Sequence, residues 1–500
     1  MTQGEIEKLT VKTEKIFSEL ENRIMEDIVR RIKENRISTA SADWQITRLQ
    51  QLGKSEAEIR KWIQDALNAS NEEMNRIFSD EAYREYYGHG HAYKLAGLTQ
   101  IPFEENIGLQ QLLESVRQQL QGEYENLAGS MGFALRDPAT GRIKYSPLMD
   151  YYRSTMDQAV IDIHSGAFDY NTVLKRTINQ LTGSGLRWID YDSGHRDRVD
   201  VAARRAVLTG FRQVQGKINE QVAAQLGTDT YEVSYHVGAR PDHQPWQGKV
   251  WSMKELIEVC GLGTGPGLLG WNCRHDYKPF ISGISSRTYT DEQLSQMLEE
   301  ENTQREYNGK KYTTYEALQQ QRKMERNMRA QRQKIKLLQE GGADEKEIIL
   351  AKAKYQGQMH TYKDFSEKMK LPEQMNRINQ DGLRDKFMPT KTELVKIASP
   401  TLKNAAGQDI IKVKRTMLTG TPNSITQLSG KKGGIERNYY DKSGRQYKQI
   451  SNHNHGNTKL HPYGENGEHA HDYIYKDGKL VDRPARELTE DERKENLDIL

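Results

Sequence analysis

The sequence predicts a predominantly helical α+β fold, and three observations carry that prediction. Long segments repeat apolar residues at helical spacing, residues 231–237 alternate apolar and polar side chains, and strand-like runs gather near the C-terminus. We expect five consecutive parts: a helical N-terminal region (1–130), a mixed α+β core (131–290), a long helical hairpin (291–395), a linker (396–414) and a small β-rich C-terminal module (415–500).

Composition limits the classes of function. The chain has 500 residues, which suggests three or four folding units at about 150 residues each. Its 73 lysines and arginines nearly balance 70 aspartates and glutamates, so the net charge of +3 does not favour nucleic-acid binding by the whole surface. Two cysteines cannot build a disulfide scaffold, so we expect a reducing compartment. No segment approaches the roughly 20 apolar residues of a membrane span, and the polar start lacks the plan of a secretory signal.

The N-terminal region shows one apolar stripe at helical spacing, which comprises Leu20, Ile24, Ile28 and Ile32. Gly53 is expected to end a helix, and two S-x-x-E capping boxes at Ser55 and Ser70 are expected to begin two more. The helix–glycine–helix rhythm of residues 45–68 is typical of a DNA-reading motif. The acidic residues of its second helix make a poor surface for phosphate and favour an ordinary helical hairpin.

The middle of the chain mixes helices with strands. Helical spacing predicts helices at 147–165, 169–182 and 197–226. The alternation at 231–237 predicts a half-buried strand, and a second short strand is expected around Val250 and Trp251.

A long helical hairpin is predicted after residue 291. Gly341 and Gly342 separate two helical segments, 314–340 and 344–370, and so mark the tip of the hairpin. Four basic residues of the first segment share one face, namely Arg322, Arg326, Arg329 and Lys336. They form either a solvated helix face or a stripe that contacts DNA or an acidic partner.

The C-terminal module combines hairpin signals with histidines. Asp477-Gly478 and Lys442-Ser443-Gly444 each lie between strand-like runs. Five histidines lie close together: His453, His455, His461, His469 and His471. Two H-x-H pairs on strands could offer four imidazoles to a divalent metal, with His453, His455, His469 and His471 as candidate ligands and Asp472 as an orienting group. The alternatives are a small nuclease, with Lys459 or Arg483 holding phosphate, or a polar loop whose hydrogen bonds are satisfied internally.

The segment 235–280 carries the most distinctive residues of the core. Gly265, Gly267 and Gly270 match G-x-G-x-x-G, but they follow a predicted helix (253–260) instead of a strand, so the dinucleotide-binding context is missing. Four residues could form a Cys₂His₂ zinc site, namely His243, Cys260, Cys273 and His275. Neither cysteine pair has close C-x₂₋₄-C spacing, so packing with internal hydrogen bonds is the alternative. A hydrolytic interpretation would use His243 or His275 as general base, oriented by Asp242 or Asp276, but no residue lies in a recognised nucleophile elbow.

Three segments carry a resemblance to a known family: HVGARPDHQPWQGKVW (236–251), GLLGWNCRHDYKPF (267–280) and SRTYTDEQL (286–294). They resemble the minor capsid protein 2 family of tailed phages and prophages and are more distantly similar to Mu F-like head morphogenesis proteins. Further matching motifs, including IPFEEN (101–106), extend the resemblance over roughly residues 1–390. The matched motif residues are Gly238, Ala239, Arg240, Asp242, His243, Trp246, Gly248, Trp271, Asn272, Cys273, Arg274 and His275.

The resemblance implies a structural protein of the phage head at the portal vertex, which assists head assembly and DNA packaging or delivery. It implies no catalytic residues and no cofactor for the core. The implied partners are the portal and major capsid proteins and packaged DNA, with no membrane, in a virion assembled in the cytoplasm of the bacterial host. The 415–500 module departs from the shared core, so the alternative is the same core carrying a nuclease or toxin-like module, in which a divalent metal could bind.

Overall fold

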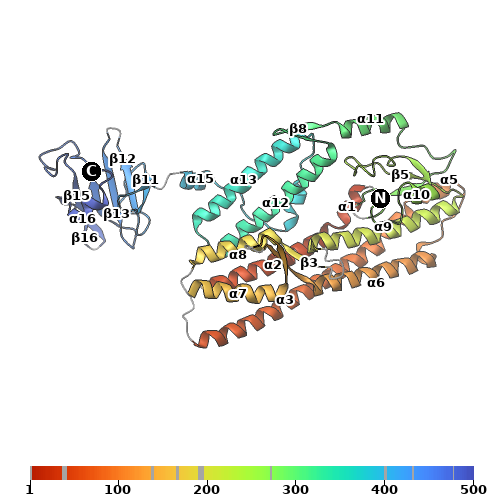
Figure 1. Ribbon diagram of the computed structural model, residues 1–500, viewed down its shortest axis with the longest axis horizontal. Coiled ribbons are helices and arrows are strands. Elements are labelled where there is room, and N and C mark those ends of the chain that lie inside the picture. Colours follow the sequence, from red (N-terminus) through yellow and green to blue (C-terminus); the bar gives the residue numbers. More distant parts are fainter. Residues whose placement is uncertain are drawn as a thin grey trace. The chain divides into compact units, whose positions relative to one another are not determined.

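The computed structural model describes the chain except residues 1–2, 36–41, 137–139, 165–167, 190–195, 271–272, 399–401, 431–432 and 477 (Figure 1). The chain forms two compact units, Met1–Pro389 and Thr390–Leu500. The structure is 53% helical with 16% strand, which confirms the predominantly helical α+β class. Among the described residues, no helix combines the length and apolar character that a membrane span requires.

Helices dominate the first unit because its apolar residues recur every three or four positions. The long helices are α2 (Val11–Asn35), α3 (Ala42–Arg76), α6 (Ile107–Gly129), α7 (Leu148–His164), α8 (Tyr170–Ser184), α9 (Val199–Gln225), α12 (Thr314–Glu340) and α13 (Glu345–Lys368). The shorter ones are α1 (Gln3–Leu9), α4 (Ala82–Tyr87), α5 (Gly90–Leu95), α10 (Met253–Glu258), α11 (Asp291–Asn302) and α14 (Met375–Ile378). The predicted stripe of α2 is fully buried, and α2 packs against α3, α7, α9 and α12 (Figure 1).

Small antiparallel sheets complete this unit. One has the order β2-β1-β3-β4, from β1 (Met131–Arg136), β2 (Ile143–Pro147), β3 (Leu186–Ile189) and β4 (Arg196–Arg198). The second has the order β6-β5-β7, from β5 (Thr230–Val233), β6 (Val250–Ser252) and β7 (Tyr277–Pro279). Because Glu232 pairs with Val250 and Val233 with Tyr277, the loops that carry both family-motif patches meet at one end of β5. A two-stranded hairpin joins β8 (Arg305–Tyr307) and β9 (Lys310–Tyr312).

Several predicted elements of the first unit are confirmed. Helices α7, α8 and α9 lie where the spacing places them, and α12 and α13 form the predicted hairpin. Gly341 follows the last turn of α12, and Gly342 adopts a φ of 65°, the left-handed conformation that glycine takes without strain.

The prediction of a break at Gly53 is wrong. Helix α3 continues through Gly53, Ser55 and Ser70, so residues 45–68 form neither a helix–turn–helix motif nor a helical hairpin. Both serines are fully buried. A glycine inside a helix costs only about 1 kcal/mol, which the packing of α3 on α2 and α6 outweighs.

The strand predicted at 231–237 is confirmed only over β5. Beyond Val233 the chain leaves the sheet and turns at Gly238, whose φ is 71°. The Gly238 amide donates to Glu301 Oε2 at 2.8 Å, which anchors this turn on α11, and the side chain of Val237 is 61% exposed.

The three regions expected within 1–395 share one hydrophobic core instead of forming separate domains. This core extends from Ile6 on α1 to Phe387 and includes residues of α2, α6, α9 and α12. A smaller cluster lies under the β5 sheet and contains Tyr231, Cys260 and Cys273.

The second unit is built on a seven-stranded sheet of order β10-β11-β12-β13-β14-β15-β18. Its strands are β10 (Leu402–Lys403), β11 (Asp409–Val413), β12 (Ile425–Ser429), β13 (Ile435–Tyr440), β14 (Gln446–Ser451), β15 (His469–Asp472) and β18 (Ala485–Arg486). Helices α15 (Lys391–Ala398) and α16 (Glu490–Glu495) flank the sheet in sequence. The two predicted hairpins are confirmed as β13–β14 and as β16 (Ile474–Lys476) with β17 (Lys479–Asp482).

The linker predicted at 396–414 is wrong for its second half. Strands β10 and β11 belong to the sheet, and β11 pairs in parallel with β12. Ile410 is 1% exposed and packs in the core of this unit, so a short apolar run in a polar segment was enough to form a strand.

Candidate functional site

Two histidine clusters are the candidate sites. The first, which we call the core cluster, consists of His243, Cys273 and His275, whose donor atoms all lie within 4.8 Å of one another. His243 comes from the turn after Gly238, and the other two precede β7. His243 Nδ1 lies 3.3 Å from His275 Nδ1, and Cys273 Sγ lies 3.5 Å from the same nitrogen. All three side chains are buried.

Hydrogen bonds within the chain satisfy the core cluster. Gln247 Oε1 accepts from the backbone N–H of His236 at 3.0 Å, so His275 Nε2, 2.9 Å from the same oxygen, must be a donor. At His243 Nε2 the chain offers both a donor, the guanidinium of Arg240, and an acceptor, the carbonyl of Pro266 at 2.8 Å. With its hydrogen on Nδ1, His243 accepts from Arg240 at Nε2 and donates to the free Nδ1 of His275.

Burial sets the protonation states of this cluster. It lowers the pKa of His275 to about 2, and the neighbouring His236 and His243 add to the effect, so the imidazole is neutral. Burial also raises the pKa of the Cys273 thiol and raises that of Cys260 to about 12. Both thiols keep their hydrogen and are poor nucleophiles.

The predicted Cys₂His₂ zinc set is not assembled. Among the described residues, the donors grouped with His243 and His275 include Cys273 but not Cys260. Cys260 follows the end of α10, where its carbonyl accepts from the Leu268 amide at 2.8 Å and its side chain packs in the smaller core.

Several other motif residues serve this local packing. A side chain at Gly267 or Gly270 would collide with a backbone carbonyl at 2.1 or 2.2 Å, so these glycines allow a loop to fold on itself. Trp246 is buried, and its ring lies 4.7 Å from that of His275. Ala239 is buried as well, Gly248 has a φ of 71°, and Arg274 makes an electrostatic or hydrogen-bonding contact. Asp242 is exposed and 3.9 Å from His243. Trp271 and Asn272 lie outside the described residues.

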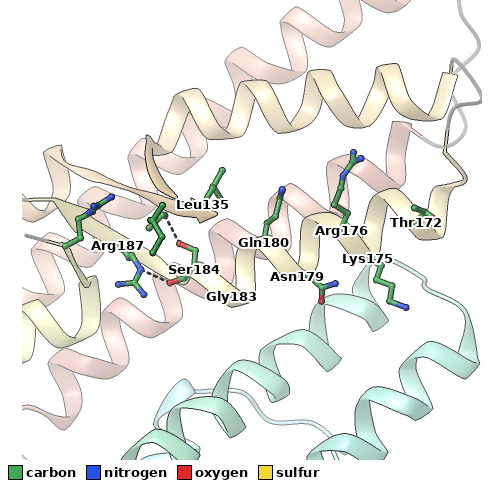
Figure 2. Close-up of a pocket in the computed structure, with 12 residues that line it drawn as sticks. Leu135, Thr172, Lys175, Arg176, Asn179, Gln180, Gly183, Ser184 and Arg187 are labelled. Atoms are coloured by element: carbon green, nitrogen blue, oxygen red, sulfur yellow. Dashed lines mark hydrogen bonds between the residues drawn. The ribbon is translucent and has the colours of Figure 1, made fainter. Parts of the chain in front are cut away.

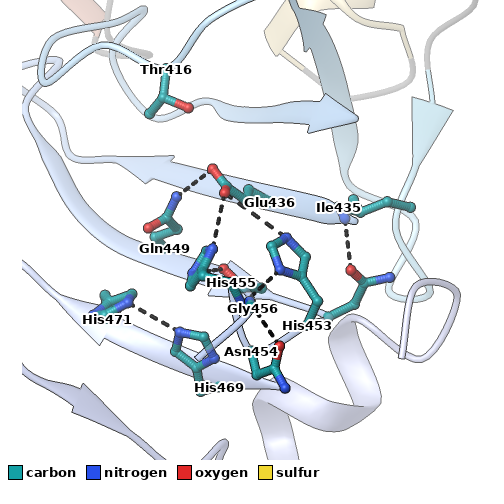
Figure 3. Close-up of polar contacts among 12 residues, drawn as sticks. Thr416, Ile435, Glu436, Gln449, His453, Asn454, His455, Gly456, His469 and His471 are labelled. Atoms are coloured by element: carbon teal, nitrogen blue, oxygen red, sulfur yellow. Dashed lines mark hydrogen bonds and ion pairs between the residues drawn. The ribbon is translucent and has the colours of Figure 1, made fainter. Parts of the chain in front are cut away.

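The second cluster, which we call the C-terminal cluster, consists of His455, His461, His469 and His471, and their donor atoms also lie within 4.8 Å of one another. His469 and His471 alternate on β15 and therefore point to the same face. His455 and His461 come from the loop between β14 and β15. His469 Nε2 lies 3.1 Å from His471 Nε2 (Figure 3).

The surroundings of the C-terminal cluster keep its histidines neutral. Burial, reinforced by neighbouring imidazoles, lowers the pKa of His455 to about 4, and burial and Arg483 lower that of His471 to about 4. Burial also lowers the pKa of His469 and His461. Neutral imidazoles are the form that binds metal ions.

The histidine pattern predicted three of these four residues. It included His453, whose Nδ1 instead accepts from the His455 amide at 3.0 Å, and which lies beside Glu436 (Figure 3). His461 was missed because the H-x-H argument concerned strands, whereas His461 reaches the cluster from a loop whose path the spacing does not define. Lys459 is exposed, Asp472 pairs with Arg486, and the Arg483 carbonyl lies 3.3 Å from His471 Nδ1.

A family model described as phage minor capsid protein 2 matches residues 1–366. The chain belongs to this family. No curated protein and no solved structure matches the chain. The chain is thus a structural protein of the phage virion, which confirms the resemblance read from the motifs. The match ends within α13, so the whole unit 390–500 lies beyond it.

The basic stripe of this minor capsid protein is partly neutralised by its own chain. Arg329 lies 3.8 Å from Asp200, and Lys336 binds Glu340 at 2.7 Å. Arg322 is half-buried and has a partner of its own, whereas Arg326 is exposed. The contact with nucleic acid stays a prediction, and Arg326 is the member best placed for it.

A basic groove was missed by the sequence analysis. It has a volume of about 930 Å³ and lies between α8 and the β1 sheet (Figure 2). Its described lining contains Lys175, Arg176, Arg187 and Arg196 and no acidic residue. These residues come from three elements, so no run of basic residues in the sequence marks the groove. Lys175 and Arg176 already pair with Glu347 and Asp162.

Proposed function

We propose that this minor capsid protein acts at the portal vertex, where it contacts the portal and major capsid proteins and assists head assembly. The observation that supports a docking role is an exposed apolar segment between α5 and α6. Leu95, Leu98, Ile101 and Ile107 are 58%, 46%, 44% and 70% exposed. Exposed apolar groups so close in sequence are typical of a protein–protein contact.

The same segment has a well-defined local structure. Phe103 is buried against Tyr83 and Tyr86, and its amide donates to the Tyr87 hydroxyl at 3.1 Å. The apolar side chains beside it are therefore held outward by a packed aromatic group, as a preformed contact surface requires.

Incorporation into particles tests this proposal. We expect the double variant Leu98→Asp, Ile107→Asp to fold normally but to be present at reduced copy number in purified particles, as measured by quantitative mass spectrometry. Leu350→Asp is the matched control, because Leu350 is also exposed (45%) but lies on α13. Wild-type incorporation of the double variant would refute a contact through this segment.

Mass spectrometry of the same particles also reports on the C-terminal unit. We expect peptides from 1–389 and from 390–500 at equal, low copy number. Absence of both sets of peptides from particles would contradict the assignment to the head.

A second candidate function is that the 390–500 unit hydrolyses nucleic acid. The feature that supports it is the C-terminal cluster, since a neutral imidazole can act as a general base and Arg483, beside His471, can hold a phosphate. The full-length protein, incubated with DNA and RNA in the presence of Zn²⁺ or Mn²⁺, would cleave one of them, and His461→Ala would abolish cleavage. No cleavage by the folded protein would refute this candidate.

A further inference from the structure

The C-terminal cluster brings four imidazoles into mutual contact. The centroid distances of its six ring pairs are 5.2 Å (455–461), 5.0 Å (455–469), 6.0 Å (455–471), 4.1 Å (461–469), 5.3 Å (461–471) and 4.7 Å (469–471). One ring nitrogen of each histidine lies within 4.8 Å of one ring nitrogen of each of the others.

The hydrogen positions of two rings follow from their other contacts. His469 Nδ1 lies 2.8 Å from the Gly467 carbonyl, and His471 Nδ1 lies 3.3 Å from the Arg483 carbonyl. A carbonyl only accepts, so both Nδ1 atoms carry the hydrogen and both Nε2 atoms present lone pairs. These two Nε2 atoms are the ones that lie 3.1 Å apart.

Two facing lone pairs repel each other unless a cation lies between them. A metal ion fits the distance, because zinc–nitrogen bonds of about 2.0–2.1 Å in a tetrahedron separate two nitrogens by about 3.4 Å. Backbone carbonyls on the opposite ring nitrogens are the usual way to orient metal-binding histidines.

The two loop histidines supply further donors. His461 Nδ1 is buried and has no hydrogen-bond partner among the described residues, and its ring stacks on that of His469. An unsatisfied buried polar atom costs about 1–3 kcal/mol, which an ion bound there would remove. His455 Nδ1 lies 3.5 Å from Glu436 Oε1 (Figure 3), and its Nε2 lies 3.3 Å from the Ser451 hydroxyl. His455 also has a φ of 54°, the left-handed backbone conformation, which is uncommon in non-glycine residues.

We propose that the C-terminal unit binds one divalent transition-metal ion through His455, His461, His469 and His471. Zn²⁺ and its neighbours suit this all-imidazole set, whereas Mg²⁺ and Ca²⁺ require oxygen ligands. The bound ion joins the 452–468 loop to β15 and stabilises the unit by mass action. This inference is independent of the role in the head, because metal binding is measured on the isolated full-length protein.

Metal titration of the full-length, EDTA-treated protein tests the inference. We expect one Co²⁺ per chain, with the intense visible bands of tetrahedral coordination, and displacement of Co²⁺ by Zn²⁺. Residues that only hydrogen-bond to a metal ligand typically contribute about 10–100-fold to metal affinity. Loss of a ligand itself in His461→Ala or His471→Gln is therefore expected to weaken binding by at least about 100-fold. His461→Ala tests the set with little risk to folding, since its ring lies in a loop and Nδ1 makes no hydrogen bond to lose.

The matched control is Lys459→Ala, which removes an exposed side chain of the same loop. We expect its affinity for Zn²⁺ to stay within about twofold of wild type. Absence of a one-to-one complex with the folded wild-type protein would overturn the inference. Unchanged affinity in both His461→Ala and His471→Gln would also overturn it.

Discussion

The core cluster and the C-terminal cluster each hold two histidines whose ring nitrogens lie close together, yet they differ in what surrounds those nitrogens. In the core cluster, two Nδ1 atoms lie 3.3 Å apart, and the Cys273 thiol lies 3.5 Å from one of them with its hydrogen retained. Arg240 and Pro266 offer a donor and an acceptor to His243. In the C-terminal cluster, two Nε2 atoms lie 3.1 Å apart, and both are fixed as acceptors by carbonyls behind them.

This difference shows that proximity alone does not define a metal site. A histidine group whose hydrogen bonds are complete within the chain is part of the packing, as in the core cluster. A group whose lone pairs converge without a donor is completed by an added cation.

The largest effect is expected from a buried arginine that supports the C-terminal unit. The side chain of Arg437 is fully buried and donates to Asp498, Asn496 and Gln427. Replacing it in Arg437→Met removes the cation beside Asp498 and the donor to Gln427 Oε1, and should lower the free energy of unfolding of the unit by about 3 kcal/mol or more. Hydrogen-exchange mass spectrometry should show faster exchange in 390–500, together with weaker Co²⁺ binding, and no change around His275.

The control is Arg415→Met, which removes an exposed arginine of the same unit. Faster exchange around His275 in Arg437→Met would show that the two clusters do not depend on separate units. It would contradict the view that each cluster is stabilised by its own surroundings.

Removing one histidine from each cluster gives the next largest effect. In the metal-free protein, His275→Ala should lower the free energy of unfolding by about 2–4 kcal/mol, because it opens a cavity and removes one of the two donors to Gln247 Oε1. His471→Ala should cost about 1 kcal/mol or less, because it also removes the repulsion with His469. Urea titration of both variants, with the metal removed, measures the difference. Equal losses would mean that the C-terminal cluster is packed like the core cluster.

The fold was predictable wherever one local pattern decided it. The stripe of α2, the hairpin of α12 and α13 with its Gly341-Gly342 tip, and the β13–β14 hairpin all follow from spacing or from a turn signal. Helix α3 did not follow, because packing overcame the stop signal at Gly53. The linker assignment failed for a similar reason, since Ile410 gains its stability from distant strands.

The sites were predictable only where the residues lie close in sequence. The alternation of His469 and His471 on one strand face was readable from the sequence, and the grouping of His243 with His275 followed from two motif patches. His461 depends on a loop path, and the basic groove at Arg187 and Arg196 depends on three elements meeting. Such long-range convergence leaves no local signal in composition or spacing.

Acid should affect the two clusters over different pH ranges. Burial lowers the pKa of His275 to about 2 and that of His455 and His471 to about 4, against an ordinary value of 6.5. The unfolded chain therefore takes up these protons first, and the stabilisation present above pH 6.5 is lost as the pH falls. We expect the C-terminal contribution to decline between about pH 6.5 and 4 and then level off, while the core contribution declines further.

Denaturation of each unit at pH 7.5, 5 and 4, followed by hydrogen exchange, measures these slopes. The variant His455→Gln, His471→Gln should flatten the slope of 390–500 and leave that of the first unit unchanged. A C-terminal unit that gains stability on acidification would contradict the assignment of neutral imidazoles.

The smallest effect is expected for DNA binding by the basic residues of α12, which also divide into internally paired and exposed groups. On α12, Arg329 and Lys336 are paired with carboxylates of their own chain, just as the histidines of the core cluster are paired within the chain. Arg326, in contrast, is exposed. Arg326→Glu should weaken DNA binding and reduce the slope of log affinity against log salt by about 1, because one phosphate contact is lost.

Arg329→Glu is a poor test, since it would also place a second carboxylate beside buried Asp200. Lys346→Glu makes the same change of charge at an exposed site on α13 and should alter the slope less. Equal slopes for Arg326→Glu and Lys346→Glu would mean that α12 makes no specific contact with DNA and that its arginines act only within the fold.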